Sequence, residues 1–270
     1  MIERWTDTRA SDDEFRLAEG PVWDGPRERL LWVEIEAGAV NTGRLSGGRI
    51  ERTGTQVLDR TVGAVAVTRT GGLLVAGSET LHEVAADGQV TPGPRILPTG
   101  SGRRLNDGKC DPSGAFIVGT MQLSEKPGTD EVLVRVDPDR SVTVIDSGLA
   151  QSNGLAWTPE FYSIDTAPGV IYVRHDYQSP REVFLRDDWD PDGMCADRDG
   201  NLWVAVYGSG EVRRFSPRGE LTGVVEVGDP EVTCPEFAGP GLDTLVITTR
   251  HHLYTADVGA VGVPSFTWAD

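Results

Sequence analysis

The stretch NDGKCDPSGAFIVGT at residues 106–120 returns in outline as PDGMCADRDGNLWVAV at residues 191–206. Both contain Asp-Gly-x-Cys, a turn rich in Asp and Gly, and a short apolar run. Weaker copies begin at residues 19, 62, 152 and 235. Their small residues fall at positions 20, 63, 108, 154, 193 and 238, so successive copies are 43, 45, 46, 39 and 45 residues apart. Six copies at nearly constant spacing indicate a repeat architecture.

The repeat unit is built from short strands. Runs such as LLWVEI (30–35), LLVAG (73–77) and AFIVGT (115–120) are rich in β-branched or aromatic residues and are bounded by Gly, Pro and Asp. No segment shows a sustained helical period with caps. A unit of about 40–45 residues with four short strands is typical of a propeller blade. We therefore predict an all-β, six-bladed β-propeller that occupies residues 1–270 as a single domain.

Charge and composition exclude several classes of protein. The formal net charge is -17, from 42 acidic and 25 basic residues, which argues against nucleic acid as a partner. No apolar run approaches the length of a membrane span. Three cysteines at positions 110, 195 and 234 include no CxxC pair, so they are expected to be buried thiols rather than disulfides or zinc ligands. We expect a cytoplasmic protein without a membrane partner, either a monomer or a small homo-oligomer.

The leading residue of each repeat carries the chemical signal. In a propeller the innermost strands run along the central channel, so equivalent strand starts converge at one mouth. Oxygen donors of this kind suit a divalent cation, although Asp and Asn before Gly also form turns. Taken as a set, Glu19, Asn153 and Asp192 predict one divalent metal, with Ca²⁺, Zn²⁺, Mg²⁺ and Mn²⁺ left open. The leading residues are Glu19, Gly63, Asn106 with Asp107, Asn153, Asp192 and Glu236. We expect Glu236 to be structural, because the last copy lacks a sharp motif.

Four motifs carry a resemblance to a known family. AEGPVW (18–23), RLNDGKCDPSGAFIVGTM (104–121), SNGLAW (152–157) and PDGMCADRDGNLWVA (191–205) resemble the SMP-30/gluconolactonase/LRE-like propellers. The match covers residues 18 to about 249. The resemblance implies a metal-dependent lactonase that opens a sugar lactone such as gluconolactone, with Glu19, Asn153 and Asp192 as metal ligands. It also implies Arg104 and Asn106 as substrate contacts.

The resemblance suggests a mechanism. The cation would act as a Lewis acid on the lactone carbonyl, and Asp192 would be the general base for the attacking water. Arg104 and Asn106 would bind the substrate, and Asp107 belongs to this substrate-binding group as the residue that orients its neighbours. Arg104 is preferred over Arg103 because of the family match alone.

Some positions depart from the family pattern. Where members commonly carry acidic residues after Gly-Thr-Met, this chain has Gln122, Leu123 and Ser124, followed by Glu125. Because these positions face the substrate in the family, the substrate preference is left open. The fourth repeat is also short.

Two other functions remain open. The same metal site could hydrolyse another ester, including a phosphotriester. A non-catalytic calcium-binding propeller would need the ligands but not Arg104. The sequence contains neither HExxH nor G-x-S-x-G, which excludes a zincin and the common serine-hydrolase route.

Overall fold

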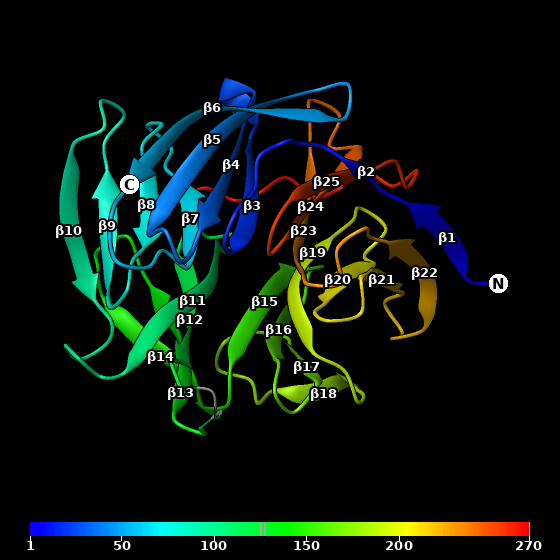
Figure 1. Cartoon of the computed structure of the whole chain (residues 1–270). Coiled ribbons are helices and arrows are strands. Elements are labelled where there is room, and N and C mark those ends of the chain that lie inside the picture. Colours follow the sequence, from blue (N-terminus) through cyan, green and yellow to red (C-terminus); the bar gives the residue numbers. More distant parts are fainter. Residues whose placement is uncertain (125, 127, 270) are drawn as a thin grey trace.

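Each sequence repeat forms one antiparallel sheet, and six sheets surround a central channel (Figure 1). The computed structural model describes residues 1–124, 126 and 128–269. The first blade contains β3 (Ala18–Asp24), β4 (Arg29–Glu34), β5 (Ala39–Ser46) and β6 (Arg49–Val57), with a short 3-10 helix, η1 (Gly25–Arg27), after β3. The second contains β7 (Ala64–Val67), β8 (Leu73–Ala76), β9 (Thr80–Val84) and β10 (Val90–Arg95). The third contains β11 (Arg103–Cys110), β12 (Phe116–Gln122), β13 (Glu131–Val136) and β14 (Val142–Leu149).

The remaining blades follow the same order from the channel outward. The fourth contains β15 (Ser152–Trp157), β16 (Phe161–Asp165), β17 (Val170–Arg174) and β18 (Glu182–Arg186), so the short fourth repeat still forms a complete blade. The fifth contains β19 (Pro191–Ala196), β20 (Leu202–Val206), β21 (Glu211–Phe215) and β22 (Leu221–Glu226). The sixth contains β23 (Val232–Ala238), β24 (Thr244–Thr249) and β25 (Leu253–Ala256). The prediction of a six-bladed β-propeller is confirmed.

The N-terminal segment closes the ring. β2 (Thr8–Arg9) pairs antiparallel with β25 and supplies the outer strand of the sixth blade. β1 (Glu3–Thr6) pairs parallel with β22 and adds a fifth strand to the fifth blade (Figure 1). The first and last parts of the chain are therefore held in adjacent blades. The sequence pattern did not reveal these strands, because they are short, polar and largely exposed.

The repeated glycines allow the inner strands to approach one another at the channel. A Cβ atom added at Gly154 of β15 would lie 2.6 Å from the main-chain oxygen of Asp192. At Gly193 of β19 it would lie 2.4 Å from Cys234 Sγ. Any side chain at these two positions would force adjacent blades apart. The glycines recur in the sequence because close packing of the inner strands around the axis requires them.

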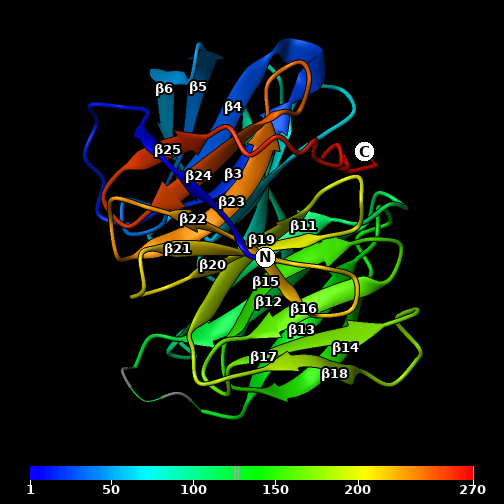
Figure 2. The same cartoon turned by 90° about the vertical axis from the view of Figure 1, so that its right-hand side faces the viewer.

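The C-terminal segment covers the channel mouth opposite the repeat heads. The amide of Val263 donates to the carbonyl of Ala196 at 3.2 Å, and that of Trp268 donates to Val67 at 2.9 Å. The ring of Phe266 packs edge-on against Trp157 with centroids 6.2 Å apart. Figure 2 shows this segment, in red, running from β25 across to the other side of the molecule. It therefore links the fifth, second and fourth blades and shields the inner channel from this side.

Removal of the residues from Val263 onward should make the inner cysteines reactive. Cys110 and Cys195 line the cavity beneath this segment, and all three cysteines are free and buried, as predicted. Burial raises the pKa of both thiols, which suppresses the reactive thiolate. We expect the full chain to resist a thiol reagent while folded and the truncated chain to react within minutes. Equal resistance in a folded truncated chain would contradict the shielding role.

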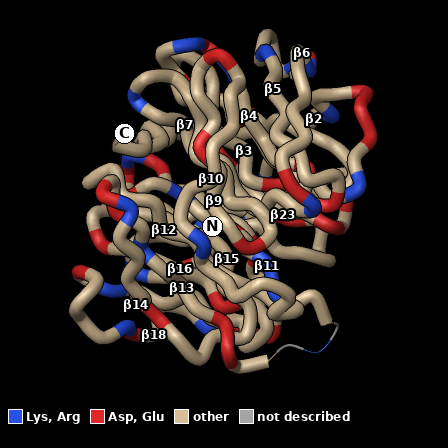
Figure 3. Tube along the Cα trace, turned by 90° about the vertical axis from the view of Figure 1, so that its left-hand side faces the viewer, with Lys and Arg blue, Asp and Glu red and all other residues tan. Residues whose placement is uncertain are grey.

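Acidic and basic positions are interspersed along the outer loops, and no long stretch of the trace is basic (Figure 3). Within the described part of the chain, no helix has the length and apolar character needed to cross a membrane.

Candidate metal and substrate site

Five of the six predicted site residues meet in one cavity. This cavity has a volume of about 350 Å³ and opens at the mouth of the channel where the inner strands begin. The predicted residues that line it are Glu19, Arg104, Asn106, Asn153 and Asp192. They come from the first, third, fourth and fifth blades. Residues separated by up to 173 positions in the sequence are therefore brought together by the ring.

The positions of these residues follow from the geometry of the inner strands. Glu19, Asn153 and Asp192 are each the second residue of their strand, in β3, β15 and β19. Because successive side chains of a strand alternate between faces, equivalent positions on equivalent strands point the same way. The three side chains thus share one depth in the channel.

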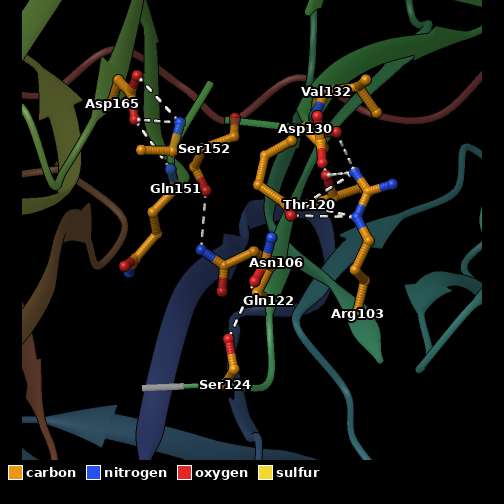
Figure 4. Close-up of polar contacts among 12 residues, drawn as sticks. Arg103, Asn106, Thr120, Gln122, Ser124, Asp130, Val132, Gln151, Ser152 and Asp165 are labelled. Carbon is orange, nitrogen blue, oxygen red and sulfur yellow. Dashed lines mark hydrogen bonds and ion pairs between the residues drawn. The ribbon is translucent and has the colours of Figure 1, made fainter. Parts of the chain in front are cut away.

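Hydrogen bonds fix the orientation of the amide groups in the cavity. Arg104 Nη1 donates to Asn106 Oδ1 at 2.7 Å. Asn106 Nδ2 then donates to Asn153 Oδ1 at 3.2 Å and to the carbonyl of Ser152 at 2.8 Å, the latter drawn in Figure 4. Asn153 Nδ2 donates to Thr166 Oγ1 at 3.1 Å, which leaves Asn153 Oδ1 on the side of Asn106. The network holds a guanidinium and an amide oxygen beside the two carboxyl groups.

The carboxyl groups of Glu19 and Asp192 are unfavourable neighbours in the absence of a cation. Burial, followed by the charges of Asp192 and Asp107, raises the pKa of Glu19 well above its ordinary value. Burial and the charge of Asp107 raise the pKa of Asp192 to about 8. Burial lowers the pKa of Arg104 to about 10, although both carboxylates oppose that shift. The buried carboxyl group of Glu19, the half-buried carboxyl group of Asp192 and an amide oxygen form a donor set that fits a hard divalent cation.

Asp107 lies behind the cavity rather than in its wall. Its Oδ1 accepts a hydrogen bond from the amide of Gly108 at 2.7 Å. Its Oδ2 is buried and has no hydrogen-bond partner among the described residues. Burial raises the pKa of Asp107, and its charge acts on both Glu19 and Asp192. This location is compatible with the expected role of Asp107 as a residue that orients its neighbours, and it places Asp107 outside the lining of the cavity.

The structure separates the roles of the two consecutive arginines. Arg103 forms an ion pair with Glu131 at 3.0 Å. It also donates to Thr120 Oγ1 at 3.0 Å, as Figure 4 shows. These contacts tie β11 to its own blade. Arg104 points to the other face and lines the cavity. The alternation of side chains along the strand therefore gives a physical reason for preferring Arg104 over Arg103 as the substrate contact. From the sequence, this preference was based on the family resemblance alone.

The repeat pattern in the sequence predicted the wrong register for the sixth repeat. Thr233, the second residue of β23, lines the cavity in the position that the repeat pattern gave to Glu236, the leading residue of the sixth copy, which we expected to be structural. Cys234, rather than Ala238, faces Gly193 and is the counterpart of the repeated glycine. Glu236 lies deeper in the channel, where its Oε2 accepts from Lys109 Nζ at 2.8 Å. A Thr-Cys pair in place of Asp-Gly hid the correct register from pattern matching.

The segment that departs from the family pattern lies beside the cavity. Met121 lines the cavity, and Ser124 Oγ donates to Gln122 Oε1 at 2.9 Å (Figure 4). Leu123 is exposed. Glu125 lies outside the described residues.

A second group with metal-binding chemistry lies near the same mouth. One ligand atom each from Asp229, Glu231 and His251 lies within 4.8 Å of the others. Asp229 accepts from Thr249 Oγ1 at 2.9 Å, His251 Nδ1 lies 3.2 Å from Asp229, and Glu231 accepts from the Tyr207 hydroxyl. These contacts account for the group without an ion.

Comparison with known proteins places this site in context. The chain is 32% identical to pentonolactonase XacC of Haloferax volcanii over 292 aligned residues, which cover 97% of each protein. It is 31% identical to a 6-deoxy-6-sulfogluconolactonase of Pseudomonas putida, covering 89% of this chain and 86% of the relative. The fold matches the calcium-binding protein regucalcin from Agrobacterium tumefaciens with a TM-score of 0.90 at 23% identity, over the whole of both chains. The model of the SMP-30/gluconolactonase/LRE-like region matches residues 17–251, and the chain therefore belongs to this family.

Proposed function

We propose that this protein is a divalent-metal-dependent hydrolase that opens sugar lactones, converting an aldonolactone to the aldonic acid. The observation that carries the proposal is the convergence of Glu19, Arg104, Asn106, Asn153 and Asp192 in one cavity. The relatives named as a pentonolactonase and a 6-deoxy-6-sulfogluconolactonase, each more than 30% identical, support the same reaction class. A metal-dependent phosphotriesterase has no comparable support.

Glu19, Asn153 and Asp192 are the residues that would hold the metal. Their oxygen donors suit Ca²⁺, Mg²⁺, Mn²⁺ or Zn²⁺, and the raised pKa values of the two carboxyl groups reflect a need for positive charge between them. A cation bound there supplies Lewis acidity that polarises the lactone carbonyl.

The chain itself supplies positioning and proton transfer. Asp192 accepts a proton from the water whose oxygen forms the new bond to the carbonyl carbon. As the bond between that carbon and the ring oxygen breaks, the proton is delivered to the ring oxygen, which becomes the hydroxyl of the acid. Arg104, held by Asn106 at 2.7 Å, offers its remaining donors to the ring ester or to sugar hydroxyls.

Chelation tests this proposal directly. We expect the purified protein to release acid from pentono- and gluconolactones well above the spontaneous rate, and EDTA to abolish the excess rate. Addition of Ca²⁺, Mg²⁺, Mn²⁺ or Zn²⁺ in separate reactions should restore it with at least one ion. If no lactone is hydrolysed with any ion although an ion binds, the function would be cation binding without catalysis.

A further inference from the structure

The cavity has a buried floor and an exposed rim. The floor contains Glu19, Arg104, Asn106 and Asn153, all of which are buried. The rim contains Gln151 and Tyr207, which are half-buried, and Asp190, which is exposed. A lactone whose carbonyl lies at the floor must place its far end, with the remaining hydroxyl groups, at this rim.

Gln151 presents an unused amide group at the rim. Its main chain is fixed, because its amide donates to Asp165 Oδ1 at 2.9 Å and its carbonyl accepts from the amide of Thr166 at 3.0 Å. Its side chain lines the cavity but makes no hydrogen bond to any described residue. Figure 4 shows the Gln151 side chain extending away from Asp165 with its amide unpaired. One such amide can donate to one hydroxyl group and accept from another.

The charged groups around the rim are mostly acidic. Arg250 also lines the cavity, but its guanidinium lies 3.2 Å from the carboxylate of Glu36 and 4.0 Å from that of Glu231. Asp190 has no ion-pair partner within the described part of the chain. Two carboxylates therefore neutralise the Arg250 guanidinium, and Asp190 adds a further carboxylate to the rim where the far end of the substrate would lie. Such a surface repels an anionic substituent and accepts an uncharged polyol.

We propose that this rim is a subsite for the uncharged, hydroxyl-bearing end of the lactone, and that Gln151 is its specificity-determining residue. The proposal rests on the lactonase function proposed above. The substrate class is a neutral aldonolactone, rather than one with a phosphate, sulfonate or carboxylate at the end remote from the carbonyl. The cavity volume of about 350 Å³ lies at the small end of ligand sites and suits a single sugar.

Gln151→Leu tests the role of the amide. The substitution nearly preserves side-chain volume and removes both hydrogen-bonding groups, so we expect KM for gluconolactone or a pentonolactone to rise about tenfold. The value of kcat should change less than about twofold, because Gln151 does not contact the reacting atoms. Gln178→Leu is the matched control, since Gln178 is exposed in the loop after β17, at the opposite end of the fourth blade from Gln151. An unchanged KM in a folded Gln151→Leu protein would overturn the proposal, as would a fall in kcat without a change in KM.

A charged analogue tests the acidic rim. We expect kcat/KM for glucono-1,5-lactone 6-phosphate to be at least about tenfold below that for glucono-1,5-lactone at low ionic strength. The gap should narrow as salt screens the rim carboxylates. The proposal would be overturned if the lactone ring of the 6-phosphate opened as fast as or faster than that of glucono-1,5-lactone. It would also be overturned if the difference in kcat/KM between the two lactones did not change with salt concentration. Failure of the wild-type protein to open either lactone would instead overturn the proposed function.

Discussion

Replacement of Asp192 by alanine is expected to lower kcat/KM for the preferred lactone by about 10²-fold or more. Asp192 faces the same cavity as Glu19 and Asn153, and its charge contributes to the raised pKa of Glu19. The substitution removes a proposed metal ligand and the proposed general base together, so the loss should exceed that of either role alone. Acid release, corrected for spontaneous hydrolysis at saturating metal, measures the effect. Wild-type activity in the variant would exclude Asp192 from both roles.

Asp197→Ala is the control within the same blade. Asp197 is buried at the turn after β19 and accepts hydrogen bonds from the amide of Asn201 at 2.9 Å and from Trp203 Nε1 at 2.9 Å. Its loss leaves buried donors unpaired and should cost about 2 kcal/mol of stability. Because Asp197 does not line the cavity, kcat/KM should remain near the wild-type value below the melting temperature. A large loss of turnover without a loss of stability would contradict this assignment.

Lys109→Met is expected to lower the free energy of unfolding by about 3–5 kcal/mol. Lys109 lies on the channel beneath the cavity, where Nζ donates to Glu236 Oε2 at 2.8 Å and to the carbonyl of Met194 at 2.9 Å. Burial lowers the pKa of Lys109, but the adjacent Glu236 carboxylate and other nearby groups outweigh it and raise the pKa above its ordinary value. The methionine would leave Glu236 buried without its cation and would remove the charge that lowers the pKa of Asp107. Chemical denaturation measures the change.

A second substitution distinguishes loss of the ion pair from loss of packing. In the double variant Lys109→Met with Glu236→Gln, the uncompensated carboxylate is gone, so we expect at least half of the lost stability to return. If the double variant is as unstable as the sum of the two single variants, the Lys109–Glu236 pair does not carry the effect. The loss of stability in Lys109→Met would then come from the lost packing of the aliphatic part of the lysine side chain.

The sequence by itself determined the architecture and predicted five of the residues that line the candidate site. Six copies of a turn-and-strand pattern specified six blades, because each copy forms a sheet that must pack against its neighbours. Once the blades close into a ring, the first residues of the inner strands meet at one mouth of the channel, and in the first, fourth and fifth blades the residue before the repeated glycine lines the cavity there. Glu19, Asn153 and Asp192 therefore could be grouped without coordinates, although they are separated by 134 and 39 positions. The glycines were detectable because the close approach of adjacent inner strands excludes a side chain.

Tertiary structure alone decided the features that depend on pairing between distant segments. The pairing of Thr8 with Thr255 closes the sixth blade, yet nothing local in that polar segment specifies a strand. The register of β23 places Thr233 at the cavity and Glu236 against Lys109, a difference of three residues that a degenerate repeat leaves undetermined. The position of Asp107 behind the cavity likewise coincides with a shift in the register between β11 and β12 from Leu105 to Gly108. Local sequence encodes strands and turns. The register of each strand and the depth of its side chains in the channel are set by contacts with segments that are distant in the chain, and these contacts exist only after the ring has closed.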